Sequence, residues 1–143
     1  MAFRGTFEYS LDNRGRIPIP ARYRASFGNR ATLVQSQDGC VEVYTAEAYE
    51  KEAELFITQR ATRKKARRIR RGFFGRSLDV DLDAQGRILL SPRLRQHGDL
   101  KGPVLIVGRG ECLELWNPER WSAEEEEIDE KYETDLESVE ESP

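Results

Sequence analysis

The feature that most constrains this 143-residue chain is an internal duplication at an offset of 71 residues. The segment Leu11–Ile17 recurs as Leu82–Ile88, and after one inserted residue Cys40–Tyr44 recurs as Cys112–Trp116. A repeat of this length indicates two similar structural units in tandem. Because fewer than about 70 residues rarely bury enough apolar surface on their own, we expect the two units to share one core.

Each half of the chain predicts the same order of elements: two short strands, a short helix and two further strands. Apolar runs and turn glycines predict a hairpin in each half, in which Gly15 or Gly86 takes the positive φ that a tight turn requires. The predicted strands are Phe7–Leu11, Arg16–Ile19, Ala31–Gln35 and Cys40–Thr45 in the first half, and Val80–Leu82, Arg87–Leu90, Val104–Val107 and Cys112–Trp116 in the second. Pro20-Ala21 and Ser91-Pro92 open the predicted helices, since proline fits the first helical turn.

Apolar residues at helical spacing predict two helices between the halves, with Thr62 as the cap of the second. We therefore expect a mainly β fold with short helices, of the α+β class, built from tandem β-β-α-β-β units. The expected divisions are a first unit over residues 5–47, a helical bridge over 48–75, a second unit over 76–121 and an acidic tail over 122–143. The first half of the tail predicts an amphipathic helix, and its last residues are expected to be disordered.

The formal charge of −3 conceals a separation of sign along the chain. Residues 122–143 hold eleven acidic residues and one basic residue, Lys131, whereas residues 1–121 carry a net charge of +7. The bridge concentrates nine cations with no acid among them: Arg60, Arg63, Lys64, Lys65, Arg67, Arg68, Arg70, Arg71 and Arg76. Such density requires a counter-charge, which either nucleic-acid phosphates or the acidic tail of the same or a neighbouring subunit can supply. Both interpretations hold if the acidic tail competes with DNA for the cations of the bridge.

The motif Asp-x-x-Gly-Arg occurs once in each half and admits two interpretations. An aspartate entering a tight turn can accept backbone N–H groups and pair with the arginine beyond, which makes the motif a structural staple. Guanidinium groups beside an exposed turn also suit phosphate or guanine, and a two-stranded ribbon fits a major groove about 12 Å wide. The predicted DNA-binding residues are Arg14, Arg16, Asp12, Arg87, Asp83, Gln85, Arg22 and Arg93, with Gly15 and Gly86 as the turn glycines.

Arginines two residues apart on the short helices cannot face the same way. We expect one member of each pair, Arg22 with Arg24 and Arg93 with Arg95, to face solvent or DNA. Aromatic residues near the start of the chain, such as Phe3, predict an apolar edge that neighbouring subunits cover.

Other residue patterns argue against several classes of function. Cys40 and Cys112 are expected to be free, packed thiols, and the one histidine offers no zinc-site spacing, so we expect neither a metal nor another cofactor. The sequence contains no nucleophile motif and no phosphate-binding glycine loop. It therefore gives no indication of an enzyme or of a small-molecule substrate. The sequence has no apolar run of bilayer length and no signal peptide, which predicts a cytoplasmic protein without a membrane partner.

Residues 3–121 resemble the MraZ family of bacterial transcriptional regulators. The resemblance rests on the opening Phe3-Arg4-Gly5, the duplicated Asp-x-x-Gly-Arg, the Ile-x-Ile-Pro at 17–20, Phe73-Phe74 after an arginine-rich bridge, and Glu114-Leu115-Trp116 with Trp121. Two features depart from the family: Arg63-Lys64 stands where Asn-Pro often opens the second bridge helix, and the acidic ending is poorly shared.

The resemblance implies a pair of SpoVT-AbrB-like units in a swapped-hairpin barrel and a ring-shaped homo-oligomer. It further implies binding to direct repeats of double-stranded DNA in the promoter of the division and cell-wall gene cluster that includes its own gene, usually as a nucleoid-associated repressor. Within the family's Asp-x-x-x-Arg signature, DNA recognition then falls to Asp12, Arg16, Asp83 and Arg87.

The alternative is an AbrB-type antitoxin-like interaction protein, whose barrel binds DNA while a flexible tail neutralises a toxin. A single unit with a hydrophobic tail would favour that alternative. This chain has two fused units, and its tail offers only Ile128, Tyr132, Leu136 and Val139 as large apolar residues. The sequence therefore favours the DNA-binding regulator.

Overall fold

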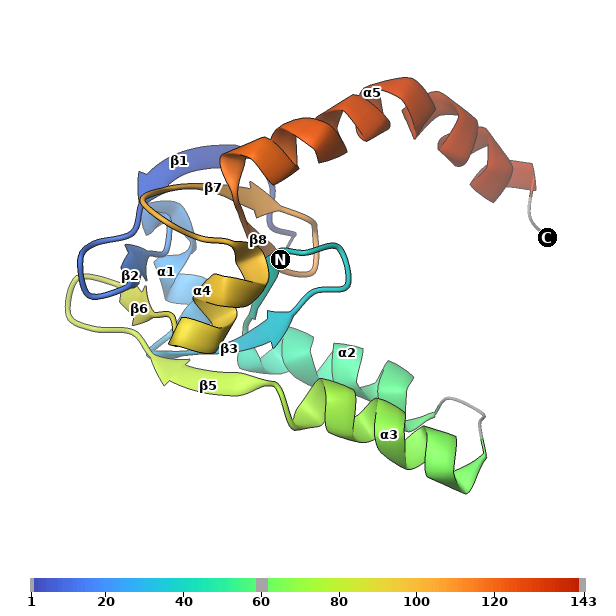
Figure 1. Ribbon diagram of the computed structural model, residues 1–143, viewed down its shortest axis with the longest axis horizontal. Helices are drawn as coiled ribbons and strands as arrows, with labels where there is room; N and C mark the ends of the chain where they lie inside the picture. Colours follow the sequence, from blue (N-terminus) through green and yellow to red (C-terminus); the bar gives the residue numbers. More distant parts are fainter. Residues whose placement is uncertain (1, 59–61, 142–143) are drawn as a thin grey trace.

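The computed structural model describes residues 2–58 and 62–141 and contains the predicted β-β-α-β-β order twice (Figure 1). The first half forms β1 (Thr6–Ser10), β2 (Arg16–Pro18), a 3₁₀ turn η1 (Ala21–Tyr23), α1 (Arg24–Phe27), β3 (Arg30–Gln35) and β4 (Val41–Tyr44). The bridge forms α2 (Ala46–Ile57) and α3 (Arg63–Phe74). The second half forms β5 (Leu78–Asp81), β6 (Arg87–Leu89), α4 (Pro92–Gly98), β7 (Pro103–Gly108) and β8 (Leu113–Trp116), and α5 (Pro118–Glu141) follows.

The two halves exchange their first strands within one six-stranded antiparallel sheet. Its order is β1-β7-β8-β4-β3-β5, so β1 of the first half pairs with β7 of the second, and β5 of the second half pairs with β3 of the first. At the centre β4 pairs with β8, with Val41 opposite Leu115. Because each half supplies strands to the sheet of the other, the predicted shared core is confirmed.

The predicted local hairpins are wrong in their strand pairing, although their turns form. Gly15 and Gly86 have φ values of +81° and +74°, and each donates its N–H to the carbonyl of the aspartate three residues earlier. Beyond the turns β1 pairs with β7, while β2 pairs with β6 in a separate ribbon that sets Ile17 opposite Ile88. Pairing across the halves is favoured because it buries both isoleucines completely in one core.

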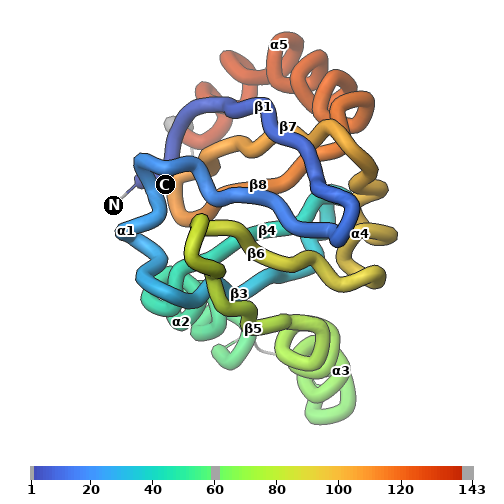
Figure 2. Tube along the Cα trace, turned by 90° about the vertical axis from the view of Figure 1, so that its left-hand side faces the viewer, coloured from blue at the N-terminus to red at the C-terminus, as the bar shows by residue number. Residues whose placement is uncertain are grey.

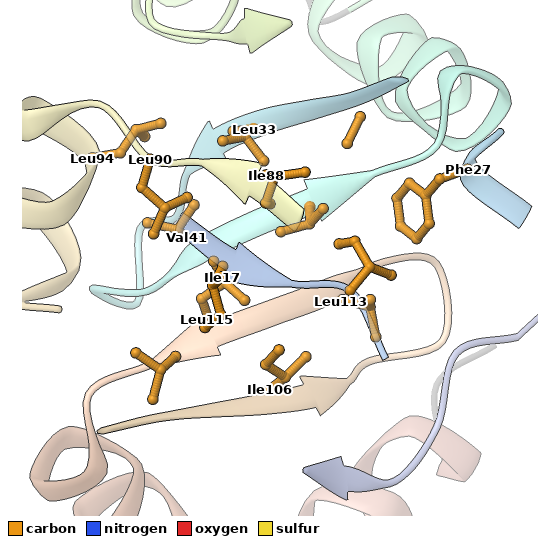
Figure 3. Close-up of a cluster of buried hydrophobic side chains, with 14 of the residues drawn as sticks. Ile17, Phe27, Leu33, Val41, Ile88, Leu90, Leu94, Ile106, Leu113 and Leu115 are labelled. Carbon is orange, nitrogen blue, oxygen red and sulfur yellow. The ribbon is translucent and has the colours of Figure 1, made fainter. Parts of the chain in front are cut away.

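The β2–β6 ribbon lies over one face of the six-stranded sheet and encloses the main core (Figure 2). From the ribbon, Ile17 and Ile88 lie among Leu33, Val41 and Leu115 of the sheet (Figure 3). In the described residues the edge strands β1 and β5 do not pair with each other. The expected swapped-hairpin barrel is thus correct in its strand exchange but is not closed, because β2 and β6 lie beside the two edges instead.

Phe3 does not form the predicted apolar edge. Its side chain is 3% exposed and packs against Tyr23 and Phe27, with ring centroids 4.9 and 5.5 Å away. Phe7 and Tyr9 are partly buried against the same core. These aromatic residues complete the core of their own chain, so they do not motivate assembly with neighbours.

The helical bridge forms as predicted, and α2 and α3 pack side by side (Figure 1). Thr45 accepts the N–H of Ala48 at the start of α2, and Thr62 accepts that of Lys65 at the start of α3, which confirms the predicted cap. Between the helices the rings of Phe56 and Phe73 stack with centroids 4.0 Å apart. Arg60, one of the nine bridge cations, lies outside the described residues.

The acidic tail is more helical than the sequence predicts. Helix α5 runs from Pro118 to Glu141, so the second half of the tail is also helical. The helix extends away from the body of the molecule (Figure 1). No glycine or proline interrupts residues 119–142, which removes the usual helix breakers. Residues 142–143 lie outside the described residues. Over the described ranges no helix is both long and apolar enough to span a bilayer.

The ribbon generates a stability prediction. Ile17→Ala should lower the free energy of unfolding by about 2–5 kcal/mol, because it leaves a cavity between ribbon and sheet. The matched control is Leu89→Ala in the partner strand, whose side chain is 52% exposed and whose loss should change stability by at most about 0.5 kcal/mol. Urea unfolding measures both variants, and equal losses would contradict the role given to the ribbon.

Candidate nucleic-acid interface

The β2–β6 ribbon brings the two Asp-x-x-Gly-Arg turns together. The Gly15 carbonyl accepts the N–H of Leu90, and the Gly86 carbonyl accepts the N–H of Ile19, each at 2.9 Å. Each turn is thus tied to the strand that follows the other turn. The two loops project side by side from one end of the molecule, opposite the far ends of α3 and α5 (Figure 1). Segments 71 residues apart in sequence therefore form one surface.

Within the first turn, the carboxylate of Asp12 organises the backbone. Its Oδ1 accepts the N–H groups of Arg14 and Arg16, each at 2.9 Å, and its Oδ2 accepts Nε–H of Arg16 at 2.8 Å. Asp83 repeats this arrangement with Gln85 and Arg87, at the same three distances. The interpretation of the motif as a structural staple is therefore confirmed.

The staples also pair across the two halves. Arg16 Nη1 lies 3.9 Å from Asp83 Oδ2, and Arg87 Nη1 lies 3.8 Å from Asp12 Oδ2. Arg87 additionally donates from Nη2 to Oε1 of Gln85 at 2.8 Å. The four charged side chains are 28–32% exposed, so one face of the cluster remains open to solvent.

The pKa of the Asp12 carboxyl is lowered to about 2 from its usual 3.8. The main cause is the hydrogen bond from the backbone N–H of Arg16, followed by the Arg16 side chain and the backbone N–H of Arg14, while partial desolvation opposes the shift. The same set of contacts, led by the backbone N–H of Arg87, lowers the pKa of Asp83. Both aspartates are thus ionised at neutral pH.

Two further arginines cover the turn glycines from the opposite half. The Arg95 guanidinium lies over Gly15, where a Cβ would approach within 3.1 Å, and the Arg24 side chain lies over Gly86, where a Cβ would approach within 2.4 Å. Arg24 also donates to the carbonyl of Ile19 at 3.1 Å. The positive φ favours glycine at both turns, and an added Cβ would also force the Arg95 or Arg24 side chain to shift.

The remaining predicted cations face solvent. Arg14, Arg22 and Arg93 are exposed, whereas Arg24 and Arg95 are half-buried, which confirms the expectation that one arginine of each helical pair faces outward. Arg22 lies 6.0 Å from the ring of Tyr23. For Arg14 and Arg93 the described part of the chain provides no ion-pair partner. These side chains are available to an external anion.

The two turns and the short helices after them form a strongly cationic end. Residues 12–24 and 83–95 together contain seven arginines and two aspartates. Because both aspartates are held by staple contacts, the surplus positive charge lies near the projecting loops. Such a surface attracts a polyanion and can place guanidinium groups against phosphates or base edges.

Sequence reasoning missed a second charged cluster, centred on Arg109. Its Nη1 contacts Glu42 and donates to Glu114 at 2.8 Å, and its Nη2 donates to the Tyr44 hydroxyl at 3.2 Å. Burial raises the pKa of Glu42. The signal in the sequence was the recurrence of glutamate at 42 and 114, but the repeat partner of Arg109 is Gln37. This cluster ties β4 to β8 and the loop before it.

Cys40 and Cys112 are free and completely buried, which confirms the prediction of packed thiols. Burial raises the pKa of both thiols, so they remain protonated at neutral pH. His97 is half-buried with Nε2 2.8 Å from the carbonyl of Ser36. Over residues 2–58 and 62–141 no group of three or more His, Cys, Asp or Glu side chains is placed to hold a metal ion.

Comparison with known proteins places these features in a family. The family model described as "MraZ protein, putative antitoxin-like" matches the chain twice, over residues 2–72 and 73–139. The chain belongs to the MraZ family. The two matches divide this MraZ-family protein within α3, in agreement with its internal duplication.

Several curated relatives are similar over nearly the whole chain. A transcriptional regulator MraZ of Heliobacterium modesticaldum is 37% identical over 92% of this chain and 92% of its own. Proteins of the same name from Thermomicrobium roseum and Mycoplasmopsis pulmonis are 36% and 35% identical, over 87% and 92% of this chain and 87% and 89% of theirs. At these coverages each match extends into both halves of the chain.

The lowered pKa of Asp12 generates a prediction about acid stability. A carboxyl whose pKa is lower in the folded state stabilises the fold above about pH 4, and this stabilisation is lost as the pH falls towards about 2. Asp12→Asn should therefore lower Tm at pH 7 and flatten the dependence of Tm on pH between about pH 4 and 2. In the control Asp81→Asn, which alters a side chain 80% exposed, the wild-type slope should persist.

Proposed function

We propose that this MraZ-family protein is a sequence-specific, DNA-binding transcriptional regulator that reads DNA with the paired turns of its β2–β6 ribbon. The single observation that carries the proposal is the juxtaposition of the two arginine-rich turns as one projecting, cationic surface. Its relatives are named transcriptional regulators, which supports a regulatory role over an enzymatic one.

The staples supply preorganisation for DNA recognition. Arg16 and Arg87 are held by carboxylates on both sides, so binding costs them little conformational entropy, and their open faces are available to base edges. Exposed Arg14, Arg22 and Arg93 suit phosphate contacts, which position the ribbon in the major groove. In this proposal Asp12, Asp83 and Gln85 orient the arginines.

We further propose that the target is a set of direct repeats in the promoter of the division and cell-wall gene cluster, including the protein's own gene, and that binding represses it. A ring-like homo-oligomer would raise avidity for repeated sites without a tighter single contact. The units 5–47 and 76–121 would present the turns, the bridge 48–75 and tail 122–143 would serve assembly, and the protein would act in the cytoplasm at the nucleoid.

Gel shifts on the protein's own promoter test the proposal. Arg16→Ala should reduce the preference for the promoter over a scrambled fragment by about 1–3 kcal/mol, because it removes a candidate base contact. Arg14→Ala should weaken binding to both fragments. It should also reduce the dependence of log K on log salt concentration by the slope of roughly one phosphate contact. The matched control Lys51→Ala removes an exposed cation on α2, away from the turns, and should leave both quantities unchanged.

Loss of folding is excluded by requiring each variant to unfold at the wild-type urea midpoint, or by correcting for the fraction folded. If Arg16→Ala and Arg14→Ala both bind the promoter as tightly as the wild type at every salt concentration, DNA reading by the turns is contradicted. If Arg16→Ala weakens both fragments equally, the turns contact phosphates and do not read sequence.

The antitoxin-like alternative shares the DNA-binding unit but assigns the tail to a toxin partner. In favour of this alternative, the matching family model is itself described as antitoxin-like. The tail of this chain, however, is a continuous acidic helix on a protein with two fused units, and not the hydrophobic tail of a one-unit antitoxin. The regulator therefore stands as the proposed function.

A further inference from the structure

Helix α5 carries an unbalanced negative charge over most of its length. From Glu124 to Glu137 it holds nine acidic residues and one cation, Lys131, which pairs with Glu127 at 2.7 Å. Like charges three and four residues apart destabilise an isolated helix. Apart from half-buried Glu124, every side chain from Ser122 to Val139 is exposed. A cationic partner would remove this repulsion.

The same helix presents an apolar stripe that its own chain leaves uncovered. Ile128, Tyr132, Leu136 and Val139 follow one another at intervals of four, four and three residues, which places them on one helical face. They are 38%, 61%, 48% and 71% exposed. Among the flanking acids, Glu125, Asp129 and Asp135 lie on or beside the stripe, whereas Glu126, Glu130 and Glu137 lie on the opposite face. The stripe-side face combines apolar contact area with negative charge.

Helix α3 and the residues after it provide the complementary surface. Residues 63–76 contain eight cations and no acid: Arg63, Lys64, Lys65, Arg67, Arg68, Arg70, Arg71 and Arg76. Beside α3 lies a hollow of about 610 Å³ whose apolar lining includes Phe56, Ile69 and Phe73. Lys65 and Arg68 lie on the face of α3 that carries Gly72, and Arg76 lines the hollow beyond the end of the helix.

Gly72 makes this wall of the hollow accessible to another helix. A Cβ built at Gly72 would meet no atom within 4 Å, so the backbone there borders open space. The acids that line the hollow, Asp38, Glu42 and Glu52, come from the β3–β4 segment and from α2, and Glu42 is paired with Arg109. Of the two arginines that line the hollow, Arg109 is paired with Glu42, and Arg76 lies on the α3 side. The α3 side therefore combines a guanidinium group with the open backbone at Gly72.

The α5 helix of the same chain does not occupy this hollow. In Figure 1, α3 and α5 leave the body from different sides and extend apart. Beyond Ser122, α5 is roughly 30 Å long, enough to cross the roughly 18 Å of α3 in another subunit. We propose that the stripe-side face of α5 docks against the α3 wall of this hollow in a second copy of the chain, which makes a head-to-tail contact between subunits.

DNA is the less suitable occupant of α3. The turns proposed to bind DNA project from the opposite end of the molecule, so a duplex bound there lies away from this hollow (Figure 1). A duplex also lacks an apolar stripe to cover Phe56 and Ile69. The inference rests on the proposed homo-oligomer and names the contact that forms it, and it does not depend on DNA binding.

Charge reversal in the full-length chain tests the contact. The first variant carries Glu125→Lys, Asp129→Lys and Asp135→Lys in α5, and the second carries Lys65→Glu, Arg68→Glu and Arg76→Glu around α3. Analytical ultracentrifugation should show each variant dissociated at concentrations where the wild type is assembled, because each places like charges across the contact. An equimolar mixture should reassemble, since every α5 then finds an α3 of opposite charge.

The matched control reverses the same number of charges on the opposite face of α5, through Glu126→Lys, Glu130→Lys and Glu137→Lys. It should remain assembled, because that face does not touch α3. Gly72→Trp should also dissociate the assembly by filling the hollow, while Gly72→Ala should leave it assembled. If the first two variants assemble as the wild type does, or if the control dissociates as fully as the first variant, the inference is overturned.

The outcomes separate this inference from the proposed function. A monomeric wild type overturns both the proposed homo-oligomer and the α5–α3 contact. If the wild type is assembled and both charge-reversal variants assemble as it does, the α5–α3 contact alone is overturned. If the α3 variant stays assembled but loses affinity for promoter and scrambled DNA alike, α3 is a phosphate-binding surface and the contact is also overturned.

Discussion

The pairing of β2 with β6 is the interaction on which the rest of the structure depends. It sets Ile17 opposite Ile88, and both side chains are completely buried beneath the six-stranded sheet. Because these strands belong to different halves, their burial requires both halves to fold together, as does the exchange of β1 and β5. The same pairing carries the two Asp-x-x-Gly-Arg turns to one end of the molecule, so the contact that buries the core also assembles the candidate site.

The geometry of the turns is compatible with both interpretations of the motif, the structural staple and the proposed DNA contact. Each aspartate closes its own turn through backbone N–H groups and also pairs with arginines of both halves. These contacts leave the charged cluster partly exposed, so a residue that stabilises the turn can still present its guanidinium to DNA. At the other end of the molecule, α3 and α5 carry opposite charges and extend apart, and the proposed contact between subunits would bring these charges together.

The sequence predicted what depends on short-range chemistry. Gly15 and Gly86 take positive φ, Thr62 caps α3, and one arginine of each helical pair faces outward, because each outcome is decided within a few residues. Predictions from the sequence failed where a segment far away in the chain supplies the hydrogen-bonding partner of a strand or the partner of a charged side chain. The strands of the predicted hairpins pair with strands of the other half instead of with each other. Arg109 contacts Glu42, 67 positions away, and has no counterpart in the repeat.

The sequence by itself determined the duplicated units, their order of strands and helices, the two turns and the separation of charge. Only the tertiary structure decided that the first strands are exchanged, that the sheet stays open, and that Arg16 and Arg87 pair with aspartates of both turns. The physical reason is that turn geometry arises from local dihedral preferences and hydrogen bonds, whereas strand partners are selected by the burial of apolar surface between segments far apart in the chain.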